Sequence, residues 1–336
     1  MNKRERVMAA VRGEPVDRVP LSFWLHNFAR EYSAQTLADE TLRLYAAFDW
    51  DFLKPQSRYQ CFAEMWGLEY RIPSDRAEWP TITRLPVLRP EAFGELTPQD
   101  PSQGALGEQI EALRLIRAGA GDDVPIVATV FSPLMVSQFM LPGGIDTIVA
   151  MMRDRPAVLQ RGLEAIAATL RDYVALLMRE PIDGIFYASN IATRDHLTAE
   201  QFRRFQAPFD LPILAAASGT SFNILHMCGN GILFDEFAGY PADVFSWAAV
   251  PGNPTLAQVH ERTGRAVLGG LPAKPQIATM TREALLARVD DALAQTAGRF
   301  HLLGPDCSIN PDTPEPLLAA VGEKLRASSR TEKRVS

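Results

Sequence analysis

Short apolar runs alternate with longer amphipathic stretches along most of this 336-residue chain. Eight of the short runs are rich in Val, Ile, Leu and Phe and are bounded by turn residues, a pattern typical of buried strands. The predicted strands cover residues 18–24, 51–54, 124–130, 182–187, 222–226, 243–246, 266–269 and 300–303.

Helical spacing of apolar residues fills most of the intervals between these strands. The predicted helices include residues 38–48, 108–118, 145–152, 158–178, 198–216, 233–238, 256–262, 282–294 and 315–327. Strict alternation of strand and helix predicts a parallel sheet, and eight such units are what a closed (β/α)₈ barrel needs. A doubly wound open sheet is the alternative, but no Gly-x-Gly-x-x-Gly follows a predicted strand. We therefore predict an α/β protein with a single (β/α)₈ barrel domain over residues 1–327.

Two stretches fall outside this alternation. Residues 73–101 are rich in proline and show little periodicity, which predicts an excursion on the surface of the barrel. Residues 328–336 are polar, which predicts a disordered tail.

Composition narrows the function classes. A net charge of −6 argues against a nucleic-acid surface. No apolar run approaches the roughly 18 residues that a membrane helix requires, and the first residues lack the apolar core of a signal peptide. Three cysteines cannot all pair within one chain. We expect a cytoplasmic protein with reduced thiols and without nucleic-acid or membrane partners; its oligomeric state stays open.

A histidine and two cysteines follow predicted strands at two places. His226 and Cys228 come at the end of strand 222–226, and Cys307 follows strand 300–303. In a barrel, the loops after the strands meet at one face, so an imidazole and two thiols are expected there together. This is a ligand set for a catalytic zinc ion that keeps its fourth position open. Alternatively, both cysteines are small buried hydrophobic residues, since their wide separation matches no local zinc motif.

Such a zinc site has a special use. It binds a further thiol and holds it as a thiolate near neutral pH, which makes a nucleophile that accepts a methyl group. A zinc-bound water would instead indicate hydrolysis. Asp306 is the only acidic residue next to the predicted ligands.

Other polar residues near strand ends are weaker candidates for the active site. Arg30 follows the first strand and could bind an anionic group or form a surface ion pair. Tyr187 ends a strand and is expected to face the barrel mouth, where its hydroxyl could act in catalysis. We interpret Asp183, Asp195 and His196 as helix caps or as residues that form supporting hydrogen bonds. Four aromatic residues could form the floor of an apolar pocket or belong to the core: Trp24, Phe28, Trp66 and Trp247.

Several segments resemble the uroporphyrinogen decarboxylase superfamily. They are residues 3–20, 182–189 and 197–202, the Leu-His-Met-Cys-Gly-Asn run at 225–230, and residues 309–315. The resemblance spans almost the whole chain in order. It implies a (β/α)₈ barrel whose active site lies at the carboxyl ends of the strands.

True uroporphyrinogen decarboxylases differ from this chain at their characteristic positions. Their Arg-Gln-Ala-Gly-Arg motif after the first strand is replaced here by Leu-His-Asn-Phe-Ala-Arg, which keeps only Arg30. Arg58 or a neighbour stands where their catalytic aspartate should be. Their Gly-His-Gly near the carboxyl terminus becomes Asp-Cys-Ser at residues 306–308. These departures argue against decarboxylation.

The corrinoid-linked methyltransferases of the same superfamily carry His-x-Cys and a distant Cys as zinc ligands, and His226, Cys228 and Cys307 match all three. The resemblance therefore implies a zinc-dependent methyltransferase. Its donor would be a corrinoid, as methylcobalamin or on a corrinoid protein, and its acceptor a small molecule such as a thiol. Cobalamin-independent methionine synthase is similar but adds a glutamate ligand, where this chain offers Trp247 and Ala248. The alternatives are a tetrapyrrole decarboxylase and a non-catalytic corrinoid-binding barrel.

Overall fold

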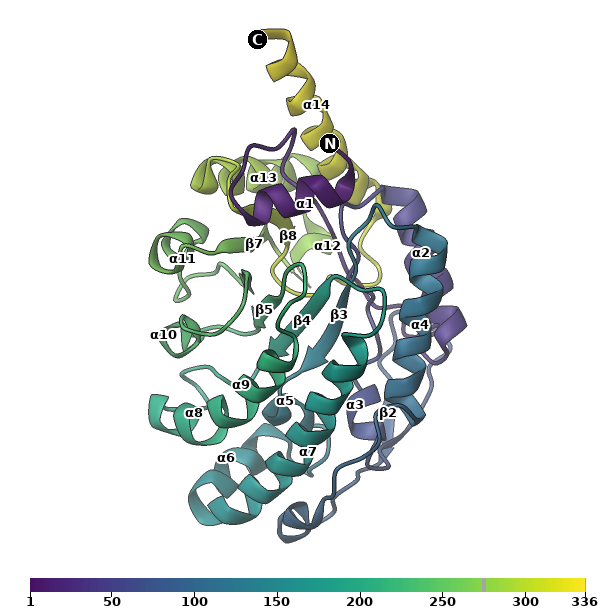
Figure 1. The fold of residues 1–336 in the computed structure, drawn as a ribbon, viewed down its shortest axis with the longest axis vertical. Coiled ribbons are helices and arrows are strands. Elements are labelled where there is room, and N and C mark those ends of the chain that lie inside the picture. The colour runs from purple at the N-terminus through teal and green to yellow at the C-terminus, as the bar shows by residue number, and fades with distance from the viewer. Residues whose placement is uncertain (274–275, 336) are drawn as a thin grey trace.

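The computed structural model describes residues 1–273 and 276–335. Six parallel strands form one sheet in the order β3-β4-β5-β6-β7-β8 (Figure 1). Each overlaps a predicted strand and extends one or two residues past its predicted end: β3 (Val127–Phe131), β4 (Gly184–Ser189), β5 (Ile224–Met227), β6 (Val244–Trp247), β7 (Ala266–Leu271) and β8 (His301–Pro305).

The other two predicted strands close the sheet into a barrel. They are extended segments that make isolated parallel bridges: Leu21 pairs with Leu303 of β8, and Leu53 pairs with Ile126 just before β3. The two segments are joined to each other by a hydrogen bond of 2.8 Å from the Asp51 amide to the Leu21 carbonyl. The ladder thus runs from β8 through both segments to β3, and the fold is the predicted (β/α)₈ barrel.

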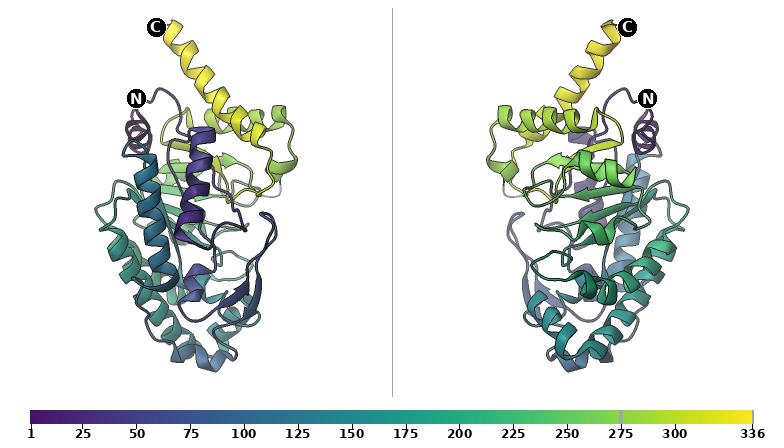
Figure 2. Two further views of the ribbon diagram at one scale, coloured as in Figure 1. Left: turned by 90° about the vertical axis from the view of Figure 1, so that its right-hand side faces the viewer. Right: turned by 90° about the vertical axis from the view of Figure 1, so that its left-hand side faces the viewer.

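Helices follow most of the strands and cover the outside of the barrel (Figures 1 and 2). The longer ones are α1 (Lys3–Val11), α2 (Ala34–Phe48), α4 (Gly104–Ala120), α6 (Ile145–Asp154), α7 (Pro156–Leu177), α9 (Ala207–Ala216), α11 (Leu256–Thr263), α13 (Arg282–Thr296) and α14 (Glu315–Val335). The short ones are α3 (Cys61–Glu64), α5 (Pro133–Ser137), α8 (Ala199–Phe205), α10 (Phe234–Phe237), α12 (Gln276–Thr279) and the 3₁₀ helix η1 (Pro90–Glu95).

The predicted helix 198–216 begins where expected but is divided in two. Thr198 and Gln201 form a capping box that begins α8, as their spacing indicates. The predicted helix 198–216 is instead two helices, α8 and α9, which meet at Gln206. Pro208 lies at the start of α9, where the first amide hydrogens have no partner within the helix, so that a proline is tolerated. In the middle of one continuous helix, the same proline would remove a hydrogen bond and interrupt the helix.

The proline-rich excursion and the predicted tail both contain regular secondary structure. Strands β1 (Glu69–Arg71) and β2 (Thr81–Arg84) pair antiparallel and flank the first part of the excursion. This hairpin reaches the barrel, because the Phe28 amide donates to the Arg76 carbonyl at 3.0 Å and Arg76 donates to the Pro311 carbonyl. Helix α14 continues through the predicted tail to Val335 and projects from the body of the molecule (Figure 2).

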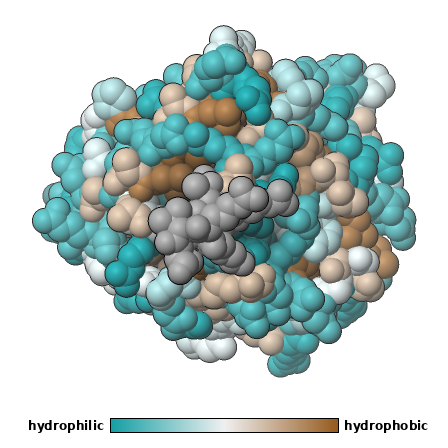
Figure 3. All heavy atoms as spheres, turned by 90° about the horizontal axis from the view of Figure 1, so that it is seen from above, coloured by the Kyte–Doolittle hydropathy of each residue, from teal (hydrophilic) through white to brown (hydrophobic). Residues whose placement is uncertain are grey.

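Alternation along the strands divides the core into two layers. On β4, Phe186 packs against His226 of β5 inside the barrel, while Tyr187 contacts Asp210 of the outer helix α9. The surface at the end where α14 emerges is mainly hydrophilic, with apolar residues in small areas (Figure 3). Within residues 1–273 and 276–335, no helix has the length and apolar character that crossing a membrane requires.

Candidate metal centre

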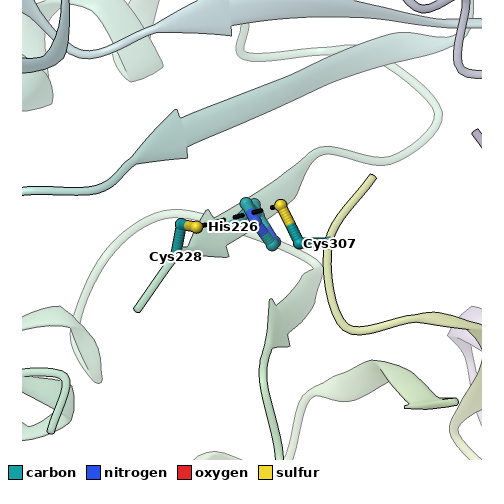
Figure 4. A group of neighbouring side chains, drawn as sticks. All are labelled: His226, Cys228 and Cys307. Atoms are coloured by element: carbon teal, nitrogen blue, oxygen red, sulfur yellow. Dashed lines mark hydrogen bonds between the residues drawn. The ribbon is translucent and has the colours of Figure 1, made fainter. Parts of the chain in front are cut away.

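His226, Cys228 and Cys307 lie together at the carboxyl ends of the barrel strands (Figure 4). One nitrogen of the imidazole and the two sulfur atoms are all within 4.8 Å of one another, and the sulfur atoms are 3.8 Å apart. Strands β5 and β8 are not neighbours in the sheet, so it is the curvature of the barrel that brings their ends together. The structure thus places the three predicted ligands in one group.

The His226 ring is fixed from two sides. Its Nδ1 atom is 3.1 Å from the hydroxyl of Ser246, the residue directly opposite on β6. Its face packs on Phe186, with ring centres 5.1 Å apart. The Nε2 atom is buried and has no hydrogen-bond partner. If Nδ1–H donates to Ser246, Nε2 keeps a lone pair that can bind a metal ion. A buried nitrogen without a partner is unfavourable, and a metal ion at this place would satisfy it.

The Cys228 loop is held by the neighbouring strand, because its amide donates to the carbonyl of Ser189 at 2.8 Å. The Cys307 loop is held likewise, since the Asp306 amide donates to Leu271 at 2.7 Å. Burial raises the pKa of the Asp306 carboxyl to about 7. The third cysteine, Cys61, lies buried on α3 outside the group.

The donor set fits zinc. Two thiols and an imidazole are ligands that zinc prefers, and three protein ligands leave one of its four tetrahedral positions open. In zinc sites, the ring nitrogen of a histidine that does not bind the metal usually forms a hydrogen bond that orients the ring. Ser246 forms this hydrogen bond with His226. Sequence reasoning did not identify Ser246, because the register between β5 and β6 decides which residue faces His226.

Arg30 and Tyr187 are not brought into this group. Arg30 is about half exposed and lies 3.7 Å from the Asp39 carboxylate, which is the surface ion pair that was its alternative. Tyr187 does not face the barrel mouth as expected. Its side chain is fully buried on the outer side of β4, where its hydroxyl donates to Asp210 at 2.6 Å. The period of two along a strand explains this, since Phe186 has the inward position.

Arg58 also has a structural place. Its guanidinium is buried and forms ion pairs with Glu64, at 2.7 Å, and with Glu108, at 2.5 Å. Lys54 of the same segment faces the barrel interior, and sequence reasoning overlooked it. Its Nζ atom lies 5.0 Å from the ring centre of Phe186 and 5.9 Å from that of Trp24. A cation at the end of an otherwise apolar strand was the signal that could have identified it.

The remaining predicted residues mainly support the fold. Asp183 accepts hydrogen bonds from Arg117, at 2.7 Å, and from Arg4, as its structural interpretation expects. Of the four aromatic candidates, Trp24 lies inside the barrel against Phe186, whereas the Trp66 indole donates to the Thr97 carbonyl in the excursion.

The chain is similar to one known protein family and to characterised methyltransferases. The family profile of uroporphyrinogen decarboxylase (URO-D) matches residues 2–327. The methylcobamide:CoM methyltransferase MtaA of Methanosarcina barkeri is 22% identical over 332 residues, covering 93% of this chain and 94% of that protein.

Among solved structures, a methyltransferase from Methanosarcina mazei superimposes with a TM-score of 0.83 at 20% identity, covering 99% of both chains. A B12-independent methionine synthase from Shewanella sp. W3-18-1 superimposes with a TM-score of 0.56 at 14% identity, covering 94% of this chain and 97% of that one. At these identities the two likenesses concern the fold.

Proposed function

Since this chain belongs to the uroporphyrinogen decarboxylase family, we propose that it is a zinc-dependent methyltransferase that moves a methyl group from a corrinoid to a thiol. The observation that carries the proposal is the group of His226, Cys228 and Cys307 with a buried Nε2 atom that has no other partner. The relatives named as methylcobamide methyltransferases support the same reaction class.

The residues of the centre have distinct tasks in this proposal. Zinc bound there would supply a Lewis acid that lowers the pKa of an incoming thiol. Cys228 and Cys307 contribute two thiolate charges that balance the charge of the ion, so that electron density stays on the acceptor sulfur. Ser246 holds His226 in the tautomer whose Nε2 is a ligand. Phe186 and Trp24, each 2% exposed, limit the access of water to the centre.

The reaction balances without a further reactant. The acceptor thiol releases its proton to solvent, and its sulfur attacks the methyl carbon of the corrinoid. The carbon–cobalt bond breaks with its electron pair left on cobalt, and a carbon–sulfur bond forms. A decarboxylase would instead need an acid in the second barrel segment, where Arg58 is ion-paired and Lys54 faces the interior.

The test is an assay of methylcobalamin demethylation by the purified, zinc-loaded protein. Its arms contain a small thiol, tetrahydrofolate, or no acceptor, and the methyl thioether product is identified by mass spectrometry. We expect demethylation only with the thiol, its loss after removal of the metal by a chelator, and its recovery when zinc is restored. Equal demethylation without a thiol, or only with tetrahydrofolate, would refute thiol methylation. Zinc-independent conversion of uroporphyrinogen to coproporphyrinogen would favour the decarboxylase instead.

A further inference from the structure

The two cysteines of the metal group are close enough to react with each other. Their sulfur atoms are 3.8 Å apart and are joined by a dashed line in Figure 4. A disulfide holds two sulfur atoms about 2 Å apart, so Cys228 and Cys307 need to approach by no more than about 2 Å. Both lie in loops just beyond the ends of β5 and β8, where the sheet ladder does not fix their side chains. A small rearrangement therefore brings the two sulfur atoms to bonding distance.

The third cysteine does not take part in this chemistry. Cys61 is buried on α3, whereas Cys228 and Cys307 are partly exposed. Burial raises the pKa of the Cys61 thiol, which keeps it in the protonated form that reacts poorly. A small oxidant from solvent therefore meets the cysteines of the metal group first, and no other thiol of the chain competes with them.

A disulfide at this pair excludes zinc from the centre. A zinc site of this kind needs both sulfur atoms as thiolates, and a sulfur atom in a disulfide has no thiolate charge to offer. Of the three ligands, only the imidazole of His226 would remain. One imidazole is too few for a stable zinc site, which takes three or four protein ligands. Oxidation of the pair therefore releases the ion and ends the activation of a thiol there.

We propose that Cys228 and Cys307 form a switch that responds to peroxide: an intramolecular disulfide replaces the zinc ion and inactivates the centre until a reductant restores the thiols. This inference rests on the zinc site of the proposed function. It concerns the regulation of that site, and the reaction catalysed there does not require it.

The oxidation balances with hydrogen peroxide as the oxidant. One thiolate attacks an oxygen atom of peroxide, the oxygen–oxygen bond breaks, and the sulfur becomes a sulfenic acid while hydroxide leaves and takes a proton from solvent. The second sulfur then attacks the sulfenic sulfur, its proton goes to the leaving hydroxyl, and water departs as the disulfide forms. Two electrons pass from the two sulfur atoms to peroxide, which ends as water.

Treatment of the zinc-loaded protein with hydrogen peroxide tests the switch. Released zinc is measured with a chromogenic chelator, free thiols by alkylation, and the link by peptide mass spectrometry without reduction. We expect two peptides joined through Cys228 and Cys307, lighter by about 2 Da than the two reduced peptides together, because two hydrogen atoms are lost. Roughly one zinc ion should be released per disulfide formed. Dithiothreitol followed by added zinc should restore both the thiols and the zinc content.

Variants with one reactive sulfur identify the two steps. Neither Cys228→Ser nor Cys307→Ser can form the disulfide, so peroxide should convert the remaining cysteine to a sulfenic acid that dimedone traps. The wild type should give little dimedone adduct, because its second sulfur removes the sulfenic acid. Cys61→Ala is the matched control and should form the disulfide as the wild type does. The peptide map of the wild type does not depend on the folding of any variant.

Three results would overturn the proposal: zinc released without a disulfide, sulfinic or sulfonic acids formed without a link, or links that run through Cys61 or between two molecules. If the disulfide forms and expels zinc, but the reduced, zinc-loaded protein demethylates methylcobalamin with no thiol, the proposed reaction fails and the switch stands. If thiol methylation proceeds and the cysteines do not become linked, the switch fails and the proposed function stands. A wild type that binds no zinc overturns both.

Discussion

Changing Cys228 to serine is expected to remove most of the bound zinc and, with it, thiol-dependent methyl transfer. The serine hydroxyl does not ionise near neutral pH, so one of the three ligands and one of the two negative charges are lost. Changes in residues that only support zinc ligands already reduce metal affinity or activity about 10- to 100-fold, so loss of a ligand should exceed about 100-fold. Cys307→Ser should behave in the same way, because its sulfur is the other member of the pair 3.8 Å apart.

The measurement is zinc content by mass spectrometry of the purified variants, together with the methylcobalamin assay. Cys61→Ala is the matched control, because it changes the third cysteine, which is buried on α3 outside the metal group. It should keep close to one zinc per chain. Wild-type zinc content in both Cys228→Ser and Cys307→Ser would show that the ligand assignment is wrong.

Unfolding of the wild-type protein is expected to become easier as the pH rises toward and through 7, because of Asp210. This carboxyl on α9 is fully buried and accepts hydrogen bonds from Tyr187 at 2.6 Å, Gln206 at 3.0 Å and Tyr240 at 3.2 Å. Burial, only partly offset by these donors, raises its pKa to about 7 from a reference value of 3.8. The folded protein therefore holds this proton at pH values where the unfolded chain has released it.

The sign of the effect follows from linkage. The contribution of Asp210 to stability is fully present below about pH 4 and is lost as the pH rises through about 7. A shift of this size corresponds to a loss on the order of 4 kcal/mol. Asp210→Asn has no titrating group at this position and lacks this dependence. The difference in free energy of unfolding between variant and wild type should therefore shift in favour of the variant by that amount from pH 4 to pH 8.

Urea unfolding of both proteins across this range measures the difference directly. Comparing variant with wild type cancels other groups that titrate, such as Asp306, whose pKa is also raised to about 7, and His301, whose pKa burial lowers to about 4. Parallel stability profiles for the two proteins would contradict the assignment of a raised pKa to Asp210.

The fold could be predicted largely because the barrel is built from local patterns. Apolar runs and helical spacing alternate regularly, and the capping box of Thr198 and Gln201 begins a helix as expected. The two segments that close the barrel are less regular in the structure, since they pair through isolated bridges, such as those of Leu21 and Leu53, and not through continuous ladders. The excursion was harder to predict, because what fixes it are long-range bonds such as that from Arg76 to Pro311.

For the candidate site, the meeting of the three ligands could be predicted from the sequence, but the orientation of the surrounding side chains could not. His226, Cys228 and Cys307 could be placed together from the sequence, because parallel strands in a barrel end at one face. The orientation of a side chain within a strand could not, since a shift of one residue moves it to the other face. Tyr187 faces outward for this reason, and Lys54 faces inward. Ser246 depends on the pairing of β6 with β5, which the sequence alone does not show.

Zinc K-edge X-ray absorption with and without an acceptor thiol tests the central claim most directly. For the zinc-loaded protein alone, the account predicts two sulfur ligands at about 2.3 Å, one imidazole nitrogen and a light atom at the fourth position. With saturating thiol, it predicts three sulfur ligands and the same imidazole. A sulfur count that stays at two after thiol is added would contradict the claim that this centre activates the methyl acceptor.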